Sequence, residues 1–162
     1  MICFYARLKD PKEAYKSVVM LEKIFLGDNL LSISPAGIAG AESDIYAFDG
    51  NTASATGIAE MLIQDYENYI ELLPCLPNEW NDGYFEGFRI RGGGELNLYW
   101  EKGRVQKVVL TSLVNNIFNF KIDDFKRMKF TVNGKAKRHE IIKNGILSFS
   151  LKKDDILIIT SY

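Results

Sequence analysis

One short segment of the sequence, AFDGNTASATGIAEML at residues 47–62, places an acidic residue where it could do chemistry. Asp49 is followed by Gly50 and Asn51, and all three residue types favour turns. A carboxylate at the start of a helix is stabilised by the helix dipole, and Gly50 would let the backbone and a substrate approach closely. The segment therefore has two interpretations: a turn that leads into a helix, or a catalytic carboxylate held at the start of one.

Two helices are expected on either side of the loop that carries this segment. The first spans residues 11–26, with Asp10 as its N-cap and Pro11 at the first helical position. The second spans residues 53–66, where apolar residues recur at helical spacing. Between them, residues 28–51 are rich in Gly, Ala and Ser, and a loop of this length is usually functional or disordered.

The second half of the sequence, from about Tyr84 onward, alternates between apolar and polar residues and is interrupted by tight turns. Lys102-Gly103 lies between two alternating segments, and Asn-Gly pairs occur at residues 133–134 and 144–145. Such pairs are strong signals for β-hairpins. About eight short strands with regular turns predict an antiparallel sandwich.

The predicted fold class is α+β, a short helical segment followed by an antiparallel β-sandwich. The boundary is expected near Pro74–Pro77, which gives a helical segment at residues 1–74 and a sandwich domain at residues 75–162. The helices alone make a poor domain, because their apolar faces need to be covered by the β part or by something outside this sequence.

The composition excludes several classes of function. The sequence has 162 residues, 47% of them apolar, and a formal net charge of -1. We therefore expect no nucleic-acid partner and no attraction to anionic membranes. No apolar run is long enough to span a bilayer, and the first residues do not read as a secretory signal.

Metal and thiol chemistry is also not expected. The two cysteines, Cys3 and Cys75, form no close pair, and the single histidine is His139. A zinc site usually needs four ligands at tight spacing, so we predict no metal and no cofactor. Two buried free thiols are favoured over a disulfide, and His139 is interpreted as a surface residue.

Other motifs have an ordinary structural interpretation. The glycines of RIRGGGELN (89–97) precede a strand, which favours a bend over a phosphate loop. The basic stretch 125–139 fits an exposed hairpin better than a nucleic-acid surface. Glu60 is expected to be solvated or to cap a helix. Four aromatic residues could stack on sugar rings: Trp80, Tyr84, Tyr99 and Trp100. Aromatic residues at strand positions more often belong to a hydrophobic core than to a sugar-binding surface.

Several of these motifs, taken in order, resemble the C-terminal end of glycoside hydrolase family 95. They are ARLKDPKEAY, the Asp-Gly-Asn turn, GIAEMLIQ, LLPCLPNEW and GFRIRGGGELNLYW. The similar run covers roughly residues 5–112, and residues 113–162 share only β character. Enzymes of this family are inverting α-L-fucosidases, with some α-L-galactosidases, and carry an (α/α)₆ barrel followed by a C-terminal β domain. The resemblance implies that residues 1–74 correspond to the last barrel helices.

The resemblance also implies roles for individual residues. Asp49 matches the family aspartate that works with asparagine side chains to activate the attacking water, as a general base. Inversion needs a second carboxyl group roughly 6.5–9.5 Å away as general acid, and in the family this glutamate lies upstream of the region matched here. Asn51 and Ser34 are candidate substrate-binding residues by their position in the loop. Ser34 stands where many family members have a histidine.

We expect this chain to be a C-terminal fragment of a family 95-like enzyme. The resemblance implies that the parent enzyme hydrolyses α-L-fucosides or related α-L-sugars and binds a fucosylated glycan. The fragment by itself is not expected to be a competent hydrolase. Family members are often exported, but this sequence leaves its compartment open. An alternative is a stand-alone β-sandwich module that binds carbohydrate or a protein partner, and a third is a structural remnant without a ligand.

Self-association is expected of the helical segment. Its large apolar residues spread over more than one helical face, and a short sandwich covers only one of them. We therefore expect a homodimer with two-fold symmetry, the commonest closed form. The residues concerned are Val18, Val19, Leu21, Ile24, Phe25, Ile58, Met61, Leu62 and Ile63.

Overall fold

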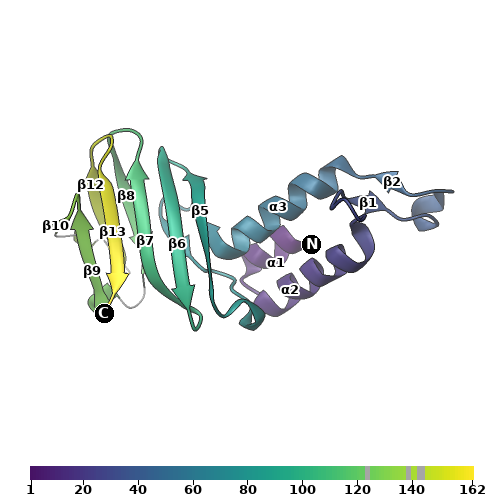
Figure 1. The fold of residues 1–162 in the computed structure, drawn as a ribbon, viewed down its shortest axis with the longest axis horizontal. Coiled ribbons are helices and arrows are strands. Elements are labelled where there is room, and N and C mark those ends of the chain that lie inside the picture. The colour runs from purple at the N-terminus through teal and green to yellow at the C-terminus, as the bar shows by residue number, and fades with distance from the viewer. Residues whose placement is uncertain (123–124, 138–139, 142–144) are drawn as a thin grey trace. The chain divides into compact units, whose positions relative to one another are not determined.

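The computed structural model divides the chain into two compact units, shown in Figure 1. The helical unit consists of residues 1–62 and 74–77, and the β unit consists of residues 63–73 and 78–162. The predicted domain division between residues 74 and 75 stays a prediction. The structure describes residues 1–122, 125–137, 140–141 and 145–162. His139, and Asn144 of the predicted Asn144-Gly145 turn, lie outside the described residues.

The helical unit contains three α-helices. These are α1 (Ile2–Leu8), α2 (Pro11–Met20) and α3 (Phe48–Leu62), and a π-helical turn at Leu21–Phe25 extends α2. The predicted helix 11–26 is confirmed. The Asp10 carboxylate caps it by accepting a hydrogen bond from the backbone N–H of Glu13 at 3.1 Å, and Pro11 opens its first turn. The separate short helix α1 was not predicted by periodicity.

The predicted position of the second helix was wrong at both ends. Instead of residues 53–66, α3 spans Phe48–Leu62, so the Asp-Gly-Asn segment lies inside the first helical turn. The Asn51 N–H donates to the Ala47 carbonyl at 3.3 Å, which begins the helix earlier. At the other end, Ile63–Gln64 pairs with a neighbouring strand, because strand pairing there outweighs the helical periodicity that continues to Tyr66.

Helices α1 and α3 pack closely around a glycine. A Cβ atom added to Gly57 of α3 would lie 2.7 Å from Ile2 of α1, so only glycine permits this approach. The salt bridge between Arg7 of α1 and Glu60 of α3 lies one turn further along. The buried apolar residues of this unit are Ile2, Ala6, Ala14, Met61, Leu62 and Cys75.

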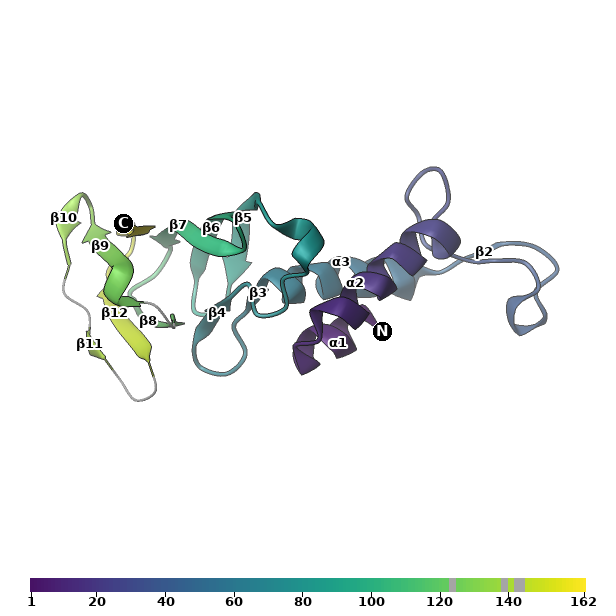
Figure 2. The ribbon, with the colours of Figure 1, turned by 90° about the horizontal axis from the view of Figure 1, so that it is seen from below.

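The loop between α2 and α3 is more ordered than expected. It contains a two-stranded antiparallel ladder of β1 (Ile33–Ser34) and β2 (Ile45–Tyr46). A short 3₁₀ turn at Ile38–Gly40 lies at its tip, and both ribbon views show this loop extending beyond the ends of α2 and α3 (Figures 1 and 2).

The β unit is built from two sheets. One has six strands in the order β10-β9-β13-β7-β6-β5, and the other has five in the order β11-β12-β8-β4-β3. The predicted α+β class with an antiparallel β part is confirmed. One pair departs from it, since β4 runs parallel to β8. The strands are β3 (Ile63–Gln64), β4 (Ile70–Leu72), β5 (Gly83–Ile90), β6 (Gly94–Glu101), β7 (Arg104–Ser112), β8 (Asn116–Lys121), β9 (Met128–Val132), β10 (Lys135–Ala136), β11 (Glu140–Ile141), β12 (Ile146–Leu151) and β13 (Ile156–Ser161).

The core of the β unit lies between these two sheets. Along β6, buried residues alternate with partly exposed ones, as expected for strands with one face toward a core. The Phe130 ring of one sheet lies 5.4 Å from the Phe149 ring of the other, measured between centroids. The largest fully buried side chains are Leu96, Leu98, Val108, Leu110, Phe120, Leu147, Phe149, Leu157 and Ile159.

The turns between strands confirm the hairpin predictions that fall on described residues. Lys102-Gly103 connects β6 to β7, and Asn133-Gly134 connects β9 to β10, with positive φ at all four residues. This is the conformation of a type I′ turn. Gly92 and Gly93 of RIRGGGELN lie in the turn between β5 and β6, and Gly94 is the first residue of β6. The described part of the basic stretch 125–139 contains the β9–β10 hairpin.

Candidate functional site

Asp49 lies in the first turn of α3 with an exposed side chain. Its Oδ1 accepts a hydrogen bond from the N–H of Gly50 at 2.9 Å, and its backbone carbonyl accepts one from the Thr52 hydroxyl at 3.1 Å. Its Oδ2 makes no hydrogen bond within the described part of the chain. One carboxylate oxygen is thus oriented by the helix start, while the other is available to water or a ligand.

Asn51 attaches the loop to the helix. Its Oδ1 accepts a hydrogen bond from the backbone N–H of Ser32 at 2.7 Å, and its Nδ2 donates to the Tyr46 hydroxyl at 3.0 Å. The Ser32 carbonyl in turn accepts from the N–H of Ala47 at 2.8 Å. We call this group of Ser32, Tyr46, Ala47 and Asn51 the Ser32 anchor. Asn51 is therefore a positioning residue in this structure, and its contact with a substrate stays a prediction.

Gly50 is required by this anchor. A Cβ atom added at this position would lie 2.2 Å from the Ser32 hydroxyl oxygen and 2.9 Å from its Cβ. Ser32 is itself buried, with 3% of its surface exposed. The absence of a side chain at Gly50 therefore lets the loop reach the first turn of α3, right beside Asp49.

Ser34, the third predicted site residue, lies in β1 opposite Ile45 of β2. Its side chain is partly buried, and among the described residues no hydrogen bond joins it to Asp49 or Asn51. The structure thus places two of the three predicted residues on one helical turn and the third on the loop ladder. The roles of all three in binding or catalysis stay predictions.

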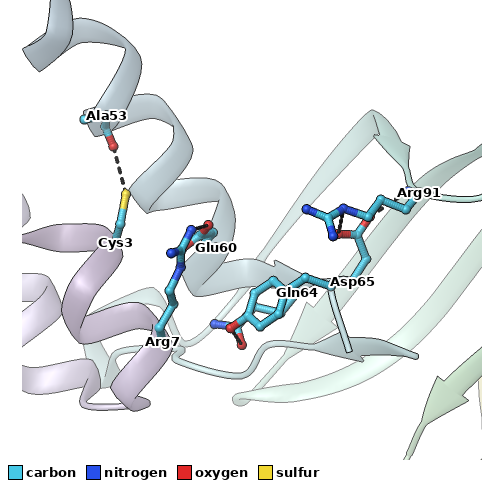
Figure 3. A network of polar contacts seen from close by, with 8 residues as sticks. Cys3, Arg7, Ala53, Glu60, Gln64, Asp65 and Arg91 are labelled. Atoms are coloured by element: carbon cyan, nitrogen blue, oxygen red, sulfur yellow. Dashed lines mark hydrogen bonds and ion pairs between the residues drawn. The ribbon is translucent and has the colours of Figure 1, made fainter. Parts of the chain in front are cut away.

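Sequence reasoning missed the residues that support this turn. Nothing in the pattern identified Ser32 or Tyr46, because their partners are 19 and 5 residues away and contact them only in the folded loop. Glu60 was assigned wrongly to a solvated or capping role. It forms a bidentate pair with Arg7, with Nε–Oε2 and Nη2–Oε1 distances of 2.9 and 2.6 Å, and 15% of its side chain is exposed (Figure 3).

Both cysteines are free thiols, as predicted. Cys75 is buried, and burial, together with the negative charge of Asp10, raises its pKa to about 11. It is therefore protonated and unreactive near neutral pH. Cys3 is only partly buried, which corrects the expectation for this residue, and its thiol lies 3.3 Å from the Ala53 carbonyl (Figure 3).

The aromatic residues of the first two long strands divide into two groups. Trp100 is buried and donates its indole N–H to the Trp80 carbonyl at 2.8 Å. Tyr84 is 68% exposed and stacks on Tyr99 of the next strand, with ring centroids 6.0 Å apart. Trp100 therefore belongs to the core, as aromatic residues at strand positions usually do, while the tyrosine pair lies on the outer face of its sheet.

Among the described residues there is neither a cluster of metal-binding side chains nor a helix that could cross a membrane. Nowhere in residues 1–122, 125–137, 140–141 and 145–162 do three or more His, Cys, Asp or Glu side chains gather as a metal ion would require. Over the same ranges, the helices are too short or too polar to cross a bilayer.

The chain thus consists of helices followed by a largely antiparallel sandwich, with an exposed carboxylate in the first turn of the last helix. A family model described as "Glycoside hydrolase family 95, C-terminal domain" matches residues 64–159, which is more than half of the chain. The chain therefore belongs to glycoside hydrolase family 95.

Two curated relatives carry fucosidase names. The chain is 28% identical over 119 residues to "Alpha-L-fucosidase 2" of Arabidopsis thaliana, covering 67% of this chain and 13% of that protein. It is 25% identical over 124 residues to "Probable alpha-fucosidase A" of Aspergillus oryzae, covering 70% and 17%. The chain thus spans less than a fifth of the length of either relative.

Solved structures of other glycoside hydrolases share a distant likeness. A family 39 enzyme from Bacteroides cellulosilyticus WH2 aligns with 51% of this chain and 17% of its own at 12% identity and a TM-score of 0.40. The GH127 β-L-arabinofuranosidase Ara127N from Geobacillus stearothermophilus T6 aligns with 70% of this chain and 18% of its own at 13% identity and a TM-score of 0.39.

Proposed function

We propose that this chain is the C-terminal part of an inverting α-L-fucosidase, and that Asp49 acts as the general base that activates the attacking water. The general acid and the asparagine side chains that assist the base come from sequence outside the 162 residues described here. The substrate is a fucosylated glycan or one with a related α-L-sugar. The chain by itself does not hydrolyse such substrates.

The main support for this proposal is the geometry at the first turn of α3, together with the membership of this chain in family 95. One oxygen of the Asp49 carboxylate is oriented by the N–H of Gly50, and the other makes no hydrogen bond within the described residues. The Ser32 anchor fixes this turn through hydrogen bonds of 2.7 to 3.0 Å. A general base needs such a defined position with an accessible oxygen.

The proposal is tested with a chimera. The corresponding C-terminal part of the Arabidopsis relative is replaced with this chain, and hydrolysis of an aryl α-L-fucoside is measured. The chimera is expected to be active, and Asp49→Asn should lower kcat by about 10²-fold or more, which is the usual contribution of a general base. The anomeric configuration of the first product, followed by NMR, should show inversion.

The matched control is Glu42→Gln in the same loop, which removes one exposed carboxylate but should leave kcat unchanged. Near-normal rates for Asp49→Asn in an active chimera would reduce Asp49 to a structural residue. The isolated chain should give no turnover above background, and measurable hydrolysis by it would contradict the need for groups from outside this sequence.

We further propose that the helical unit associates with other helices. Of the residues named above for self-association, Met61 and Leu62 are buried within the chain and Ile24 is 49% exposed. Other apolar residues of this unit, Met1, Phe4, Leu8 and Met20, expose between 45% and 71% of their surface. In a longer enzyme neighbouring barrel helices would cover such residues, and in the isolated chain a second copy would do so. Light scattering at micromolar concentration should show a dimer. A monomer mass would contradict self-association, whatever the outcome of the chimera experiment.

A further inference from the structure

A polar cavity of about 300 Å³ lies on the five-stranded sheet of the β unit. Its walls come from three places: the β3–β4 loop, the turn between β5 and β6, and the strand β8. The polar and aromatic side chains that line it include Asp65, Tyr66, Tyr69, Arg91, Asn116 and Asn119. All belong to the β unit and are distant in sequence from the candidate general base. Pockets of this size are at the lower end of those that hold small ligands.

The charges in this cavity cancel each other. Asp65 accepts a hydrogen bond from the backbone N–H of Arg91 at 2.6 Å, and its other oxygen lies 3.7 Å from the Arg91 guanidinium (Figure 3). With one carboxylate beside one guanidinium, the cavity does not select an anion or a cation. It offers paired donors and acceptors to a neutral ligand.

Two asparagines on β8 provide hydrogen-bonding capacity that the protein does not use. Asn116 donates its Nδ2 to the Gly92 carbonyl at 2.8 Å, and its Oδ1 makes no hydrogen bond within the described residues. Asn119 donates to the Asn68 carbonyl at 3.1 Å, and its buried Oδ1 has no hydrogen-bond partner among the described residues. An unpaired buried acceptor is rare in native proteins, but a donor in the cavity would reach this oxygen only if the Asn119 side chain turned. The Oδ1 of Asn116 is therefore the acceptor that the site offers to a ligand that donates hydrogen bonds.

Two tyrosines supply the apolar surface. The Tyr66 hydroxyl donates to Gln64 at 2.8 Å and the Tyr69 hydroxyl donates to Glu67 at 2.7 Å. Lys121 lies 5.6 Å from the centroid of the Tyr69 ring. These contacts fix the orientation of both rings, and a fixed aromatic face packs well against the C–H face of a sugar ring.

We propose that this cavity of the β unit is a carbohydrate-binding site that takes a neutral pyranose unit of a glycan. The tyrosine rings contact the C–H face of the sugar, and the Asn116 oxygen accepts a hydrogen bond from one of its hydroxyl groups. Because the parent enzyme is proposed to act on fucosylated glycans, the identity of the glycan rests on that proposal. The site itself rests on the cavity.

The test is direct binding by the full 162-residue chain. NMR titration with 2′-fucosyllactose, L-fucose and D-galactose should shift the amides of residues 65–69, 91–92 and 116–119, with a Kd on the order of millimolar for at least one sugar. Tyr66→Ala and Asn116→Ala should each weaken this binding by about tenfold. Tyr66→Phe, which keeps the ring but loses the hydroxyl contact to Gln64, should bind more tightly than Tyr66→Ala.

Two control variants separate this site from others. Tyr84→Ala removes an exposed tyrosine from the other sheet, and Asp49→Asn removes the proposed general base, so both should leave the Kd unchanged. Because Asn116 also holds the β5–β6 turn, circular dichroism must show that Asn116→Ala is folded, and Tyr66→Ala tests the site without touching that bond.

Three outcomes would overturn the site: no shifts with any of these sugars at ten millimolar, shifts mapped elsewhere, or equal loss of binding in Tyr84→Ala. The general-base proposal and the cavity-site proposal can be contradicted independently of each other. Near-normal rates for Asp49→Asn in an active chimera, with sugar binding by the chain intact, would contradict the general base alone. An active chimera that depends on Asp49, without sugar binding by the chain, would contradict the cavity site alone.

Discussion

The contacts that stabilise the helical unit differ from those that stabilise the β unit. In the β unit, large apolar side chains from two sheets face one another and are completely buried. In the helical unit, the buried apolar residues are fewer, and the close packing of Gly57 on Ile2 is accompanied by long-range polar contacts such as the Arg7–Glu60 pair and the Ser32 anchor. The β unit therefore contains a larger hydrophobic core than the helical unit, which depends more on polar contacts.

The largest loss of stability is expected for a substitution in the core of the β unit. Phe149 is fully buried, with Phe120 and Phe130 at centroid distances of 6.1 and 5.4 Å. Phe149→Ala should lower the free energy of unfolding by about 3–5 kcal/mol. Both tryptophans, Trp80 and Trp100, belong to this unit, so urea denaturation followed by their fluorescence measures the loss.

The control on the same sheet is Ile117→Ala, since 58% of Ile117 is exposed. This substitution should change stability by no more than about 0.5 kcal/mol. Similar losses for Phe149→Ala and Ile117→Ala would show that the β unit does not depend on a central core.

A smaller effect is expected where the helical unit packs most closely. Gly57→Val places atoms within 2.7 Å of Ile2, and such overpacking costs about 1–3 kcal/mol. Amide hydrogen exchange in α1 should become faster. Ala55→Val on the exposed side of the same helix is the matched control, and equal exchange rates in the two variants would contradict close packing at Gly57.

The polar link between α1 and α3 should contribute less. In the Arg7–Glu60 pair, Arg7 is 59% exposed and Glu60 15%, so solvent screens much of the attraction. A double-mutant cycle of Arg7→Gln and Glu60→Gln should give a coupling free energy of about 1 kcal/mol that decreases with salt. Coupling near zero would show that apolar contacts alone join these helices.

The smallest effect is a pH dependence in the β unit. Asp155 has a lowered pKa, because its carboxylate accepts hydrogen bonds from the backbone N–H of Lys152 and from the Asn133 side chain. Its contribution to stability is therefore present above the unfolded pKa near 3.8 and is lost as pH falls through the lower folded value. Asp155→Asn should flatten the stability profile below pH 4.

The control for this profile is Asp154→Asn. Asp154 has a positive φ of 68°, a conformation that asparagine adopts readily, so this variant should keep the acid dependence. If both variants show the same profile as the unaltered chain, the hydrogen bonds of Asp155 do not influence stability at low pH.

The sequence predicted the β unit better than the helical unit, for physical reasons. Hairpin signals such as Lys102-Gly103 and Asn133-Gly134 act locally, and the structure confirms both turns. The start of α3 depends on the loop contacts of Asn51 and its end on the pairing of Ile63–Gln64. These contacts involve residues distant in sequence, so local periodicity placed both ends several residues too late.

The candidate site shows the same limit. Motif resemblance could nominate Asp49, Asn51 and Ser34, but it could not reveal that the Asn51 side chain is already engaged by Ser32 and Tyr46. The cavity on the five-stranded sheet could not be predicted either. It forms where the parallel pairing of β4 with β8 brings the β3–β4 loop beside a strand that is distant in sequence. No sequence pattern predicted that pairing.

The Ser32 anchor has a consequence for how this protein can be altered. The loop is joined to α3 at its base, by Ser32 with Ala47 and Asn51, while residues 35–44 beyond the β1–β2 ladder are closed by their own hydrogen bond from Ala36 to Asp44. The tip can therefore be exchanged or lengthened as a cassette without moving the first turn of α3. Substitutions and insertions in this segment should therefore leave the Asp49 carboxylate in place.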